Sequence, residues 1–272
     1  MSVISACPAG DPGGRPPGLV PPTAARGSAL GRLTITELKL FARERVGLIR
    51  SVGLPLLLLI VFGSVPFYTQ PRTYLSGHTL LDAYVPILIA FSLAMLSLIA
   101  LPMVLAGYRE KGVLRRLQTT PAGPARVLAA QLVINLAIAG VTVTLILAVA
   151  RLGYGVHLPR QLAGFVIAAL LAAAALMSIG LFIAAVAATG RAAQAIGLIL
   201  FYPMMFFAGL FLPLPVMPSV LRHISHAAPL GAAVQALQDA ALGHWPHPEQ
   251  LLTMAAYAVA FGLAAARLFR WE

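Results

Sequence analysis

The chain is poor in charge, in lysine and in cysteine, and each shortage excludes a class of protein. Only 10% of its 272 residues are charged, against about a quarter in soluble domains, and 60% are hydrophobic. A single cysteine, Cys7, excludes an intramolecular disulfide and a cysteine-ligated metal site. Neither Lys39 nor Lys111, the only lysines, is followed by Ser or Thr. A phosphate-binding P-loop needs that pair, so we expect no ATPase site in this chain and no cofactor bound to it.

Ionisable residues are also scarce where the chain is most apolar. None of the eight acidic residues falls in the middle of a long apolar run. The six histidines, which lie in connecting segments or at the edges of the runs, are His78, His157, His223, His226, His244 and His247. Their spacing is not that of a compact metal site, and we expect none. Because proton relays and ion-coupled transport use ionisable groups inside spans, we expect any transport energy to come from another subunit.

Six long apolar runs dominate the chain, at 48–67, 83–107, 127–150, 162–188, 192–212 and 250–269. Each is close to the ~20 residues that a helix needs to cross a bilayer. The runs are continuous and rich in Leu and Ala, unlike the alternating pattern of barrel strands. The sequence therefore predicts an all-α polytopic membrane protein, with a six-helix transmembrane domain over residues 48–269.

The net charge of +11 is explained by topology rather than by nucleic-acid binding. No solvated basic domain is available to bind nucleic acid. Six spans place fifteen of the nineteen Lys and Arg residues on the same side as the N-terminus. Basic loops stay on the inner side of a membrane, so we expect both termini in the cytoplasm.

The first fifty residues precede the apolar runs. Residues 1–28 are rich in Pro and Gly and have no apolar core typical of a signal peptide, so we expect a disordered cytoplasmic tail. Residues 29–50 repeat apolar side chains at helical spacing beside a basic stripe. This pattern predicts an amphipathic helix on the membrane surface; the alternative is an extension of the first span.

The densest charged stretch, "YREKGVLRRLQTTP" at 108–121, lies between the second and third runs. Val113, Leu114 and Leu117 can form one apolar face of a short helix. The polar face would consist of Glu110, Lys111, Arg115 and Arg116. Such a helix can dock in a groove of a cytoplasmic partner. On spacing alone, a plain basic loop is the favoured alternative.

Three motifs resemble those of ABC-2 type transporter permeases. "YREKGVLRRLQTTPAGPARVLAAQLV" is similar to the family's loop after span two, and its matching residues are Glu110, Gly112, Leu114, Arg115, Leu117, Thr120 and Pro121. "GLFLPLPVMPSVLRHISHAAPL" is similar to the segment after span five, through Gly209, Pro213, Pro218 and Pro229. "ELKLFARERVGLIRSVGLPLLLLIVFG" is similar to the interfacial helix that leads into span one. The bacterial drug-efflux branch, with its daunorubicin-resistance-type permeases, is the most similar.

This resemblance implies a half-transporter in a bacterial cytoplasmic membrane. Two permease copies would pair in the bilayer and dock on ABC ATPase subunits, which carry the ATP and Mg²⁺. Residues 108–121 would form the coupling helix, with Gly112 allowing close approach to the ATPase. The segment 213–248 would form short re-entrant helices on the outer side.

The substrate is less defined than the class. Apolar lining and few fixed charges favour efflux of a hydrophobic drug, a lipid-like molecule or a secondary metabolite, with antibiotic resistance as one outcome. In "FYPMMFF", Tyr202, Met204, Met205 and Phe206 are candidates for the substrate path, because Met and aromatic side chains suit adaptable apolar ligands. The alternative is ordinary core or lipid contact. A glycan exporter permease and a non-transporting membrane scaffold also fit the sequence.

Overall fold

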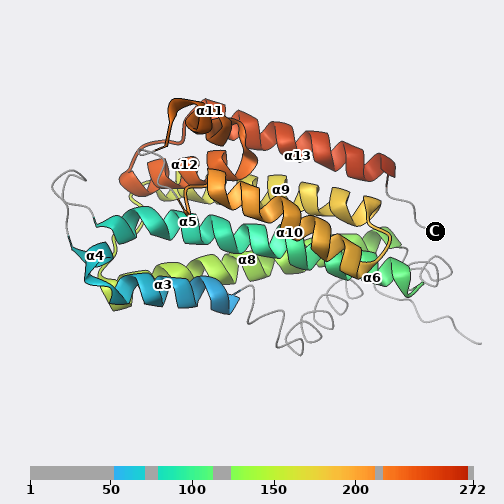
Figure 1. Cartoon of the computed structure of the whole chain (residues 1–272), viewed down its shortest axis with the longest axis horizontal. Helices are drawn as coiled ribbons and strands as arrows, with labels where there is room; N and C mark the ends of the chain where they lie inside the picture. The colour runs from blue at the N-terminus through green and yellow to red at the C-terminus, as the bar shows by residue number, and fades with distance from the viewer. Residues whose placement is uncertain (1–51, 71–78, 113–123, 212–216, 269–272) are drawn as a thin grey trace, which may run out of the picture.

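The computed structural model describes residues 52–70, 79–112, 124–211 and 217–268. Within these ranges all regular structure is helical, with no strand, and most helices run along one long axis (Figure 1). In chain order they are α3 (Leu54–Ser64), α4 (Pro66–Thr69), α5 (Leu80–Ala94), the π-helix η3 (Met95–Ala100), α6 (Leu101–Glu110), α8 (Pro124–Tyr154), α9 (Leu162–Val186), α10 (Gly190–Phe207), α11 (Ser219–Ala227), α12 (Pro229–Leu242) and α13 (Pro248–Leu268).

Five of the six predicted spans are present as helices long and apolar enough to cross a bilayer. They are Leu80–Glu110, Val127–Tyr154, Leu162–Val186, Gly190–Phe207 and Pro248–Leu268. The predicted first span is not confirmed, because its described helix, α3, has 11 residues and would extend only about 16 Å at 1.5 Å per residue. Pro66 limits it: Val65 is extended, as a residue before proline tends to be.

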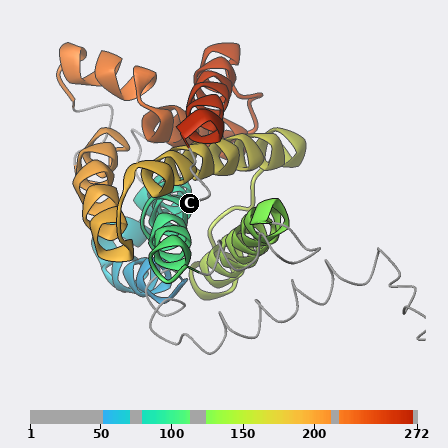
Figure 2. The same cartoon turned by 90° about the vertical axis from the view of Figure 1, so that its right-hand side faces the viewer.

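One helix forms the centre of the bundle. α5, η3 and α6 follow one another without a break from Leu80 to Glu110, and 89% of the most apolar stretch is buried. Viewed from the end of the bundle, this central helix is surrounded by α3, α8, α9 and α10 (Figure 2). α12 packs on it near the end where α5 begins. A helix that is apolar on all sides is expected to be buried in this way.

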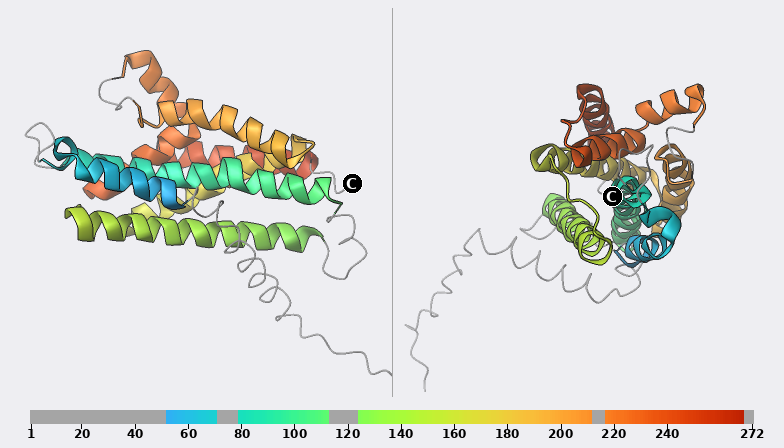
Figure 3. Two further views of the ribbon diagram at one scale, coloured as in Figure 1. Left: turned by 60° about the horizontal axis from the view of Figure 1, so that its bottom comes forward. Right: turned by 90° about the vertical axis from the view of Figure 1, so that its left-hand side faces the viewer.

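The two ends of the bundle are built differently. α4, α11 and α12 lie at the end where α5 begins, and the helices α6 and α10 meet at the opposite end (Figures 1 and 3). The charge distribution of the sequence predicts that the first end faces outward and the second faces the cytoplasm. The two ends are called outer and cytoplasmic after that prediction.

Glycine and proline set the helix boundaries in the outer segment. Gly209 follows α10 with φ +86°, a left-handed conformation that glycine adopts readily. Pro218 precedes α11 and Pro229 is the first residue of α12, where the missing N–H of proline costs nothing. The predicted segment 213–248 thus contains two helices; their re-entrant character stays a prediction.

Several predicted features lie outside the described residues. These are the tail 1–28, the interfacial helix 29–50, most of the predicted coupling helix and Pro213.

The outer end of the central helix is fixed by one carboxylate. Asp82 accepts the backbone N–H of Thr79 at 2.8 Å, and its own backbone N–H donates to Thr79 Oγ1 at 3.2 Å, which forms a capping box. Its second oxygen accepts the backbone N–H of His157 at 3.1 Å. Asp82 therefore joins the start of α5 to the connection between α8 and α9.

Candidate functional site

The centre of the buried helix departs from α-helical geometry. Residues Met95–Ala100 form a π-helix, and Leu101 N–H bonds to the carbonyl five residues earlier, at Leu96. Pro102 follows directly and has no N–H, so it can bond neither to the Leu98 carbonyl nor to that of Ser97. The Ser97 hydroxyl is buried and also lacks a partner. π-Helical turns are frequent at functional sites.

Two glycines from neighbouring helices approach these two carbonyls. A Cβ added to Gly180 of α9 would lie 2.0 Å from Ser97 O, and one added to Gly197 of α10 would lie 2.0 Å from Leu98 O. Only glycine allows such an approach, which brings Cα–H groups near carbonyls that Pro102 cannot serve. The helices α9 and α10 are thus in backbone contact with the π-helix. Gly180 therefore serves packing within one chain.

The cytoplasmic end of the central helix holds the turn between α9 and α10. Arg109 Nη1 donates to Ala185 O at 3.0 Å, and Nη2 donates to Ala187 O. Ala185 and Ala187 belong to the last turn and the end of α9, where carbonyls have no partner within the helix. A cation there also opposes the negative end of the helix dipole.

Glu110 makes the complementary contact with the next helix. Its Oε2 accepts the backbone N–H of Gly190, the first residue of α10, at 3.0 Å. A carboxylate is favourable at a helix N-terminus because the free N–H groups there carry positive partial charge. A Cβ at Gly190 would lie 3.0 Å from Met103 O, so α10 begins directly against α6. Consecutive residues of opposite charge thus bind the end of α9 and the start of α10.

The central helix ends where the predicted coupling segment begins. Lys111 is exposed, and Gly112 has φ +65° in a left-handed conformation that commonly ends helices. The helix therefore does not run on unbroken into the loop. The remaining predicted coupling residues lie beyond it, outside the described residues; they are Val113, Leu114, Arg115, Arg116 and Leu117.

The predicted substrate-path residues do not share one face. Met205 is 1% exposed within the bundle, and Tyr202 is 60% exposed on the outside of α10. Met204 and Phe206 are intermediate. None of these four side chains lines either of two pockets formed by the described parts of the chain, one at the outer segment and one between α8 and α9.

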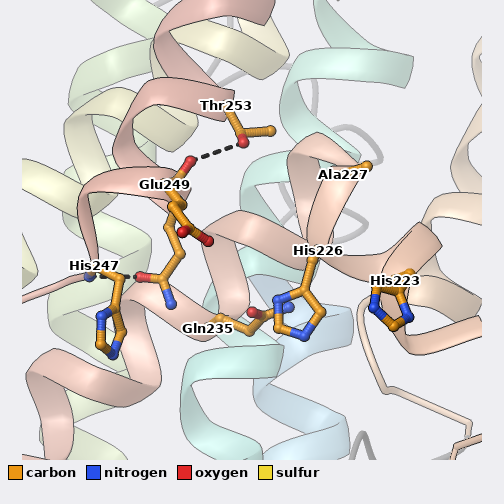
Figure 4. Close-up of a pocket in the computed structure, with 8 residues that line it drawn as sticks. His223, His226, Ala227, Gln235, His247, Glu249 and Thr253 are labelled. Carbon is orange, nitrogen blue, oxygen red and sulfur yellow. Dashed lines mark hydrogen bonds between the residues drawn. The ribbon is translucent and has the colours of Figure 1, made fainter. Parts of the chain in front are cut away.

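Metal-ligating side chains are scattered over the described parts of the chain. Among the described residues, no three His, Cys, Asp or Glu side chains lie close enough to share a metal ion. The histidines of the outer segment come together only in part: His223, His226 and His247 line one open pocket between α11, α12 and the start of α13 (Figure 4).

A comparison with protein families identifies the chain. The model of the ABC-2 type transporter family matches residues 28–242, about four-fifths of the chain. The chain belongs to the ABC-2 type transporter family. No curated protein matched it. The ABC-2 permease match begins before α3 and ends with α12, so it includes the central helix and its contacts with α9 and α10.

Membership confirms several predictions in their general form. The protein is a multi-pass membrane permease subunit of an ABC exporter, and it is the transmembrane component rather than the catalytic ATPase. The family works together with an ABC ATPase.

The site includes residues that sequence patterns did not single out. Arg109 lies within the charged stretch at 108–121, and Gly190 stands in no motif of the sequence. A charged pair directly after an apolar run indicates such a site, because charged residues in the last turn of a spanning helix need partners nearby. The partners at Ala185, Ala187 and Gly190 are backbone groups, which leave no pattern in the sequence.

Proposed function

We propose that this permease exports a hydrophobic drug, a lipid-like molecule or a secondary metabolite, and that residues 108–121 couple it to a separate ATPase. The observation that carries the proposal is the unbroken central helix, which runs from the outer end at Leu80 to Glu110, inside the predicted coupling segment 108–121. A buried helix with neighbours on all sides cannot move without moving them, because packed interiors deform little.

The contacts at its cytoplasmic end suggest how motion is passed on. When ATP closes the ATPase pair, the loop would displace the end of α6. Arg109 and Glu110 hold the end of α9 and the start of α10, so these two helices would follow. The π-helix above them, with the close approaches of Gly180 and Gly197, is where the three helices would shift against one another.

The substrate class is supported by where charge is missing. Along the described central helix, ionisable side chains other than tyrosine occur only near the ends, at Asp82, Arg109 and Glu110. A path beside such a helix offers apolar surface rather than fixed charge, which suits apolar substrates. A glycan exporter permease remains the alternative within the family.

A second permease copy is part of the proposal. Ile199 and Tyr202 of α10, and Leu57 of α3, are large side chains exposed on the outside of the bundle. In a homodimer, the outward face of α10 would meet its counterpart and enclose a path that one chain lacks. Co-purification of two differently tagged copies tests this, and recovery of one tag alone would contradict it.

The docking role needs a variant that leaves internal contacts intact. Glu110→Arg is unsuitable, because it would also remove the bond to Gly190 N–H. Lys111→Glu changes an exposed side chain within the predicted coupling helix. Arg267→Glu is the matched control: it makes the same reversal on an exposed residue in the last turn of α13, at the same end of the bundle.

The experiment is affinity purification of each variant from its native membrane, followed by ATPase assay and mass spectrometry of partners. We expect wild type and Arg267→Glu to retain a P-loop ATPase and Lys111→Glu to lose most of it, with unchanged elution in size-exclusion chromatography. If Lys111→Glu retains the ATPase fully, the coupling role of this loop is wrong. If the wild-type chain purifies alone and without ATPase activity, a non-transporting scaffold is favoured.

A further inference from the structure

The pocket between α8 and α9 is an apolar groove with a volume of about 260 Å³. α8 lies on the opposite side of the central helix from α10 (Figure 2), so a second copy placed against α10 leaves this groove open. Ten of its eleven lining residues are apolar, and the exception is Thr144. The Thr144 hydroxyl donates to the carbonyl of Gly140 on its own helix at 2.9 Å. The groove therefore presents almost only hydrocarbon to a ligand.

The groove exists because α8 and α9 pack on different neighbours. α8 packs mainly on α3 and α5, whereas α9 packs mainly on α12 and α13. Small residues line the space between them: Gly140 belongs to α8, and Ala169 and Ala173 belong to α9. A Cβ added to Gly140 would meet nothing within 4 Å. Side chains of the described residues therefore leave this space unfilled.

The groove leads from the outside of the bundle to the central helix. Leu136 of α8 and Leu170 of α9 line it and are 41% and 50% exposed. Leu93 also lines it, and this residue of α5 is 2% exposed and lies two residues before the π-helix. A molecule that fills the groove would therefore touch the buried helix directly, between two helices that otherwise cover it.

The position of the groove determines what can enter it. The three helices that line it are each long and apolar enough to cross a bilayer, and every lining residue lies inside those spans. Water does not fill apolar space of this kind, because it would lack hydrogen-bond partners there. Space left empty would deprive the lining side chains of contacts. The groove therefore takes up hydrocarbon, which a bilayer supplies as acyl chains.

The dimensions of the groove suit an acyl chain better than a helix. Its lining on α8 covers residues 136–144, which extend over about 12 Å at 1.5 Å per residue. One leaflet contributes about 15 Å, half of the hydrocarbon thickness of a bilayer, so most of one acyl chain can lie along the groove. A helix is about 10 Å wide with its side chains, and it is too bulky for a groove of this length and volume.

We propose that the groove between α8 and α9 holds the acyl chain of a bilayer phospholipid in contact with Leu93 of the central helix. Van der Waals contacts provide the affinity, because lipid tails and the lining are equally apolar. A chain in the groove touches protein on several sides, whereas a chain against the outward face of α13 touches protein on one side. The site needs neither an ATPase nor transport, so it stands apart from the proposed export function.

The test is photolabelling of the full chain in nanodiscs of phosphatidylcholine that carries a diazirine in one acyl chain. Mass spectrometry compares the labels on the groove with those on the outward face of α13, where Leu252, Val259 and Leu263 are exposed. Each signal is divided by that of the same peptide in SDS-unfolded protein, which removes differences in side-chain reactivity. We expect roughly fivefold stronger labelling of the groove, because many weak carbon contacts add up.

Gly140→Leu is the decisive variant, because its side chain enters the open space of the groove. We expect it to reduce groove labelling to the level of α13 while unfolding at the same or a higher temperature. Ala169→Leu fills the same space from α9 and should act alike. Gly153→Leu is the matched control on α8, since a Cβ there also meets nothing within 4 Å and the residue does not line the groove.

Two results would overturn the proposal. If Gly140→Leu and Ala169→Leu both keep the wild-type labelling, the acyl chain lies elsewhere. If wild-type labelling of the groove is no stronger than that of α13, the groove holds only exchanging bilayer lipid, or protein from a second copy or another segment covers it. Gly153→Leu should keep the wild-type pattern in either case.

Discussion

Replacing Gly197 by Ala tests whether the close contact between α10 and the π-helix is real. A Cβ at this position would lie 2.0 Å from Leu98 O, and real Cβ atoms stay at least 3.0 Å from such neighbours. Leu98 O belongs to the backbone and cannot rotate away as a flexible side chain could. α10 must therefore move away from the π-helix by about 1 Å. Overpacking of this kind costs ~1–3 kcal/mol or more, and it outweighs the gain of up to ~1 kcal/mol that Ala normally brings inside a helix.

Gly140 of α8 provides the matched control, because a Cβ there would meet nothing within 4 Å. We expect Gly140→Ala to leave stability unchanged or slightly raised and Gly197→Ala to lower it, with about 1–3 kcal/mol between them, because the gain from alanine applies to both variants and cancels. The free energy of unfolding is measured by titrating purified protein in mild detergent with SDS and following circular dichroism. Equal stability of the two variants would refute the close contact. Gly180→Ala, which would place its Cβ 2.0 Å from Ser97 O, should behave like Gly197→Ala.

Two further predictions concern the ends of the central helix. Arg109→Gln should lower the free energy of unfolding by roughly 1.5–3 kcal/mol, because charged hydrogen bonds to two carbonyls at the end of α9 are lost. SDS titration measures this loss, with Lys111→Gln as the exposed control. Equal stability of the two variants would contradict the prediction. Asp82→Asn should destabilise the outer end by about 1 kcal/mol, because the single amide oxygen can accept from Thr79 or from the N–H of His157 but not from both. The expected readout is faster hydrogen exchange at the start of α5 or at His157, with no change at α6; an unchanged pattern would contradict these two hydrogen bonds.

Composition was sufficient to predict the class of fold, but hydropathy misplaced helix ends. The second span was expected over 83–107, and the helix runs over Leu80–Glu110. Hydropathy stops before Arg109 because charge is costly in a bilayer. The helix continues because backbone groups of α9 and α10, about eighty residues further on, satisfy that charge. Such partners depend on the tertiary fold and not on local sequence.

Local clusters in sequence were a poor guide to shared location. "FYPMMFF" joins aromatic residues and methionines, yet a helix rotates successive side chains by about 100°. Tyr202 therefore lies outside the bundle and Met205 inside it. The opposite holds at the outer pocket, where His223, Gln235 and His247 come from three separate elements and meet. No spacing rule connects residues brought together by the packing of α11, α12 and α13.

The π-helix at Met95–Ala100 also sets the rotational phase of the central helix. A π turn holds about one residue more than an α turn, so everything after it is rotated by about 100° relative to an unbroken α-helix. The outer half, α5, packs on α3, α8 and α12, whereas α6 packs mainly on α9 and α10. Removing one residue from this stretch would therefore turn Arg109 and Glu110 away from their partners while the outer half stayed in place. The number of residues between Leu93 and Pro102 thus determines the direction in which side chains at the cytoplasmic end of the helix point, whichever apolar residues occupy that stretch.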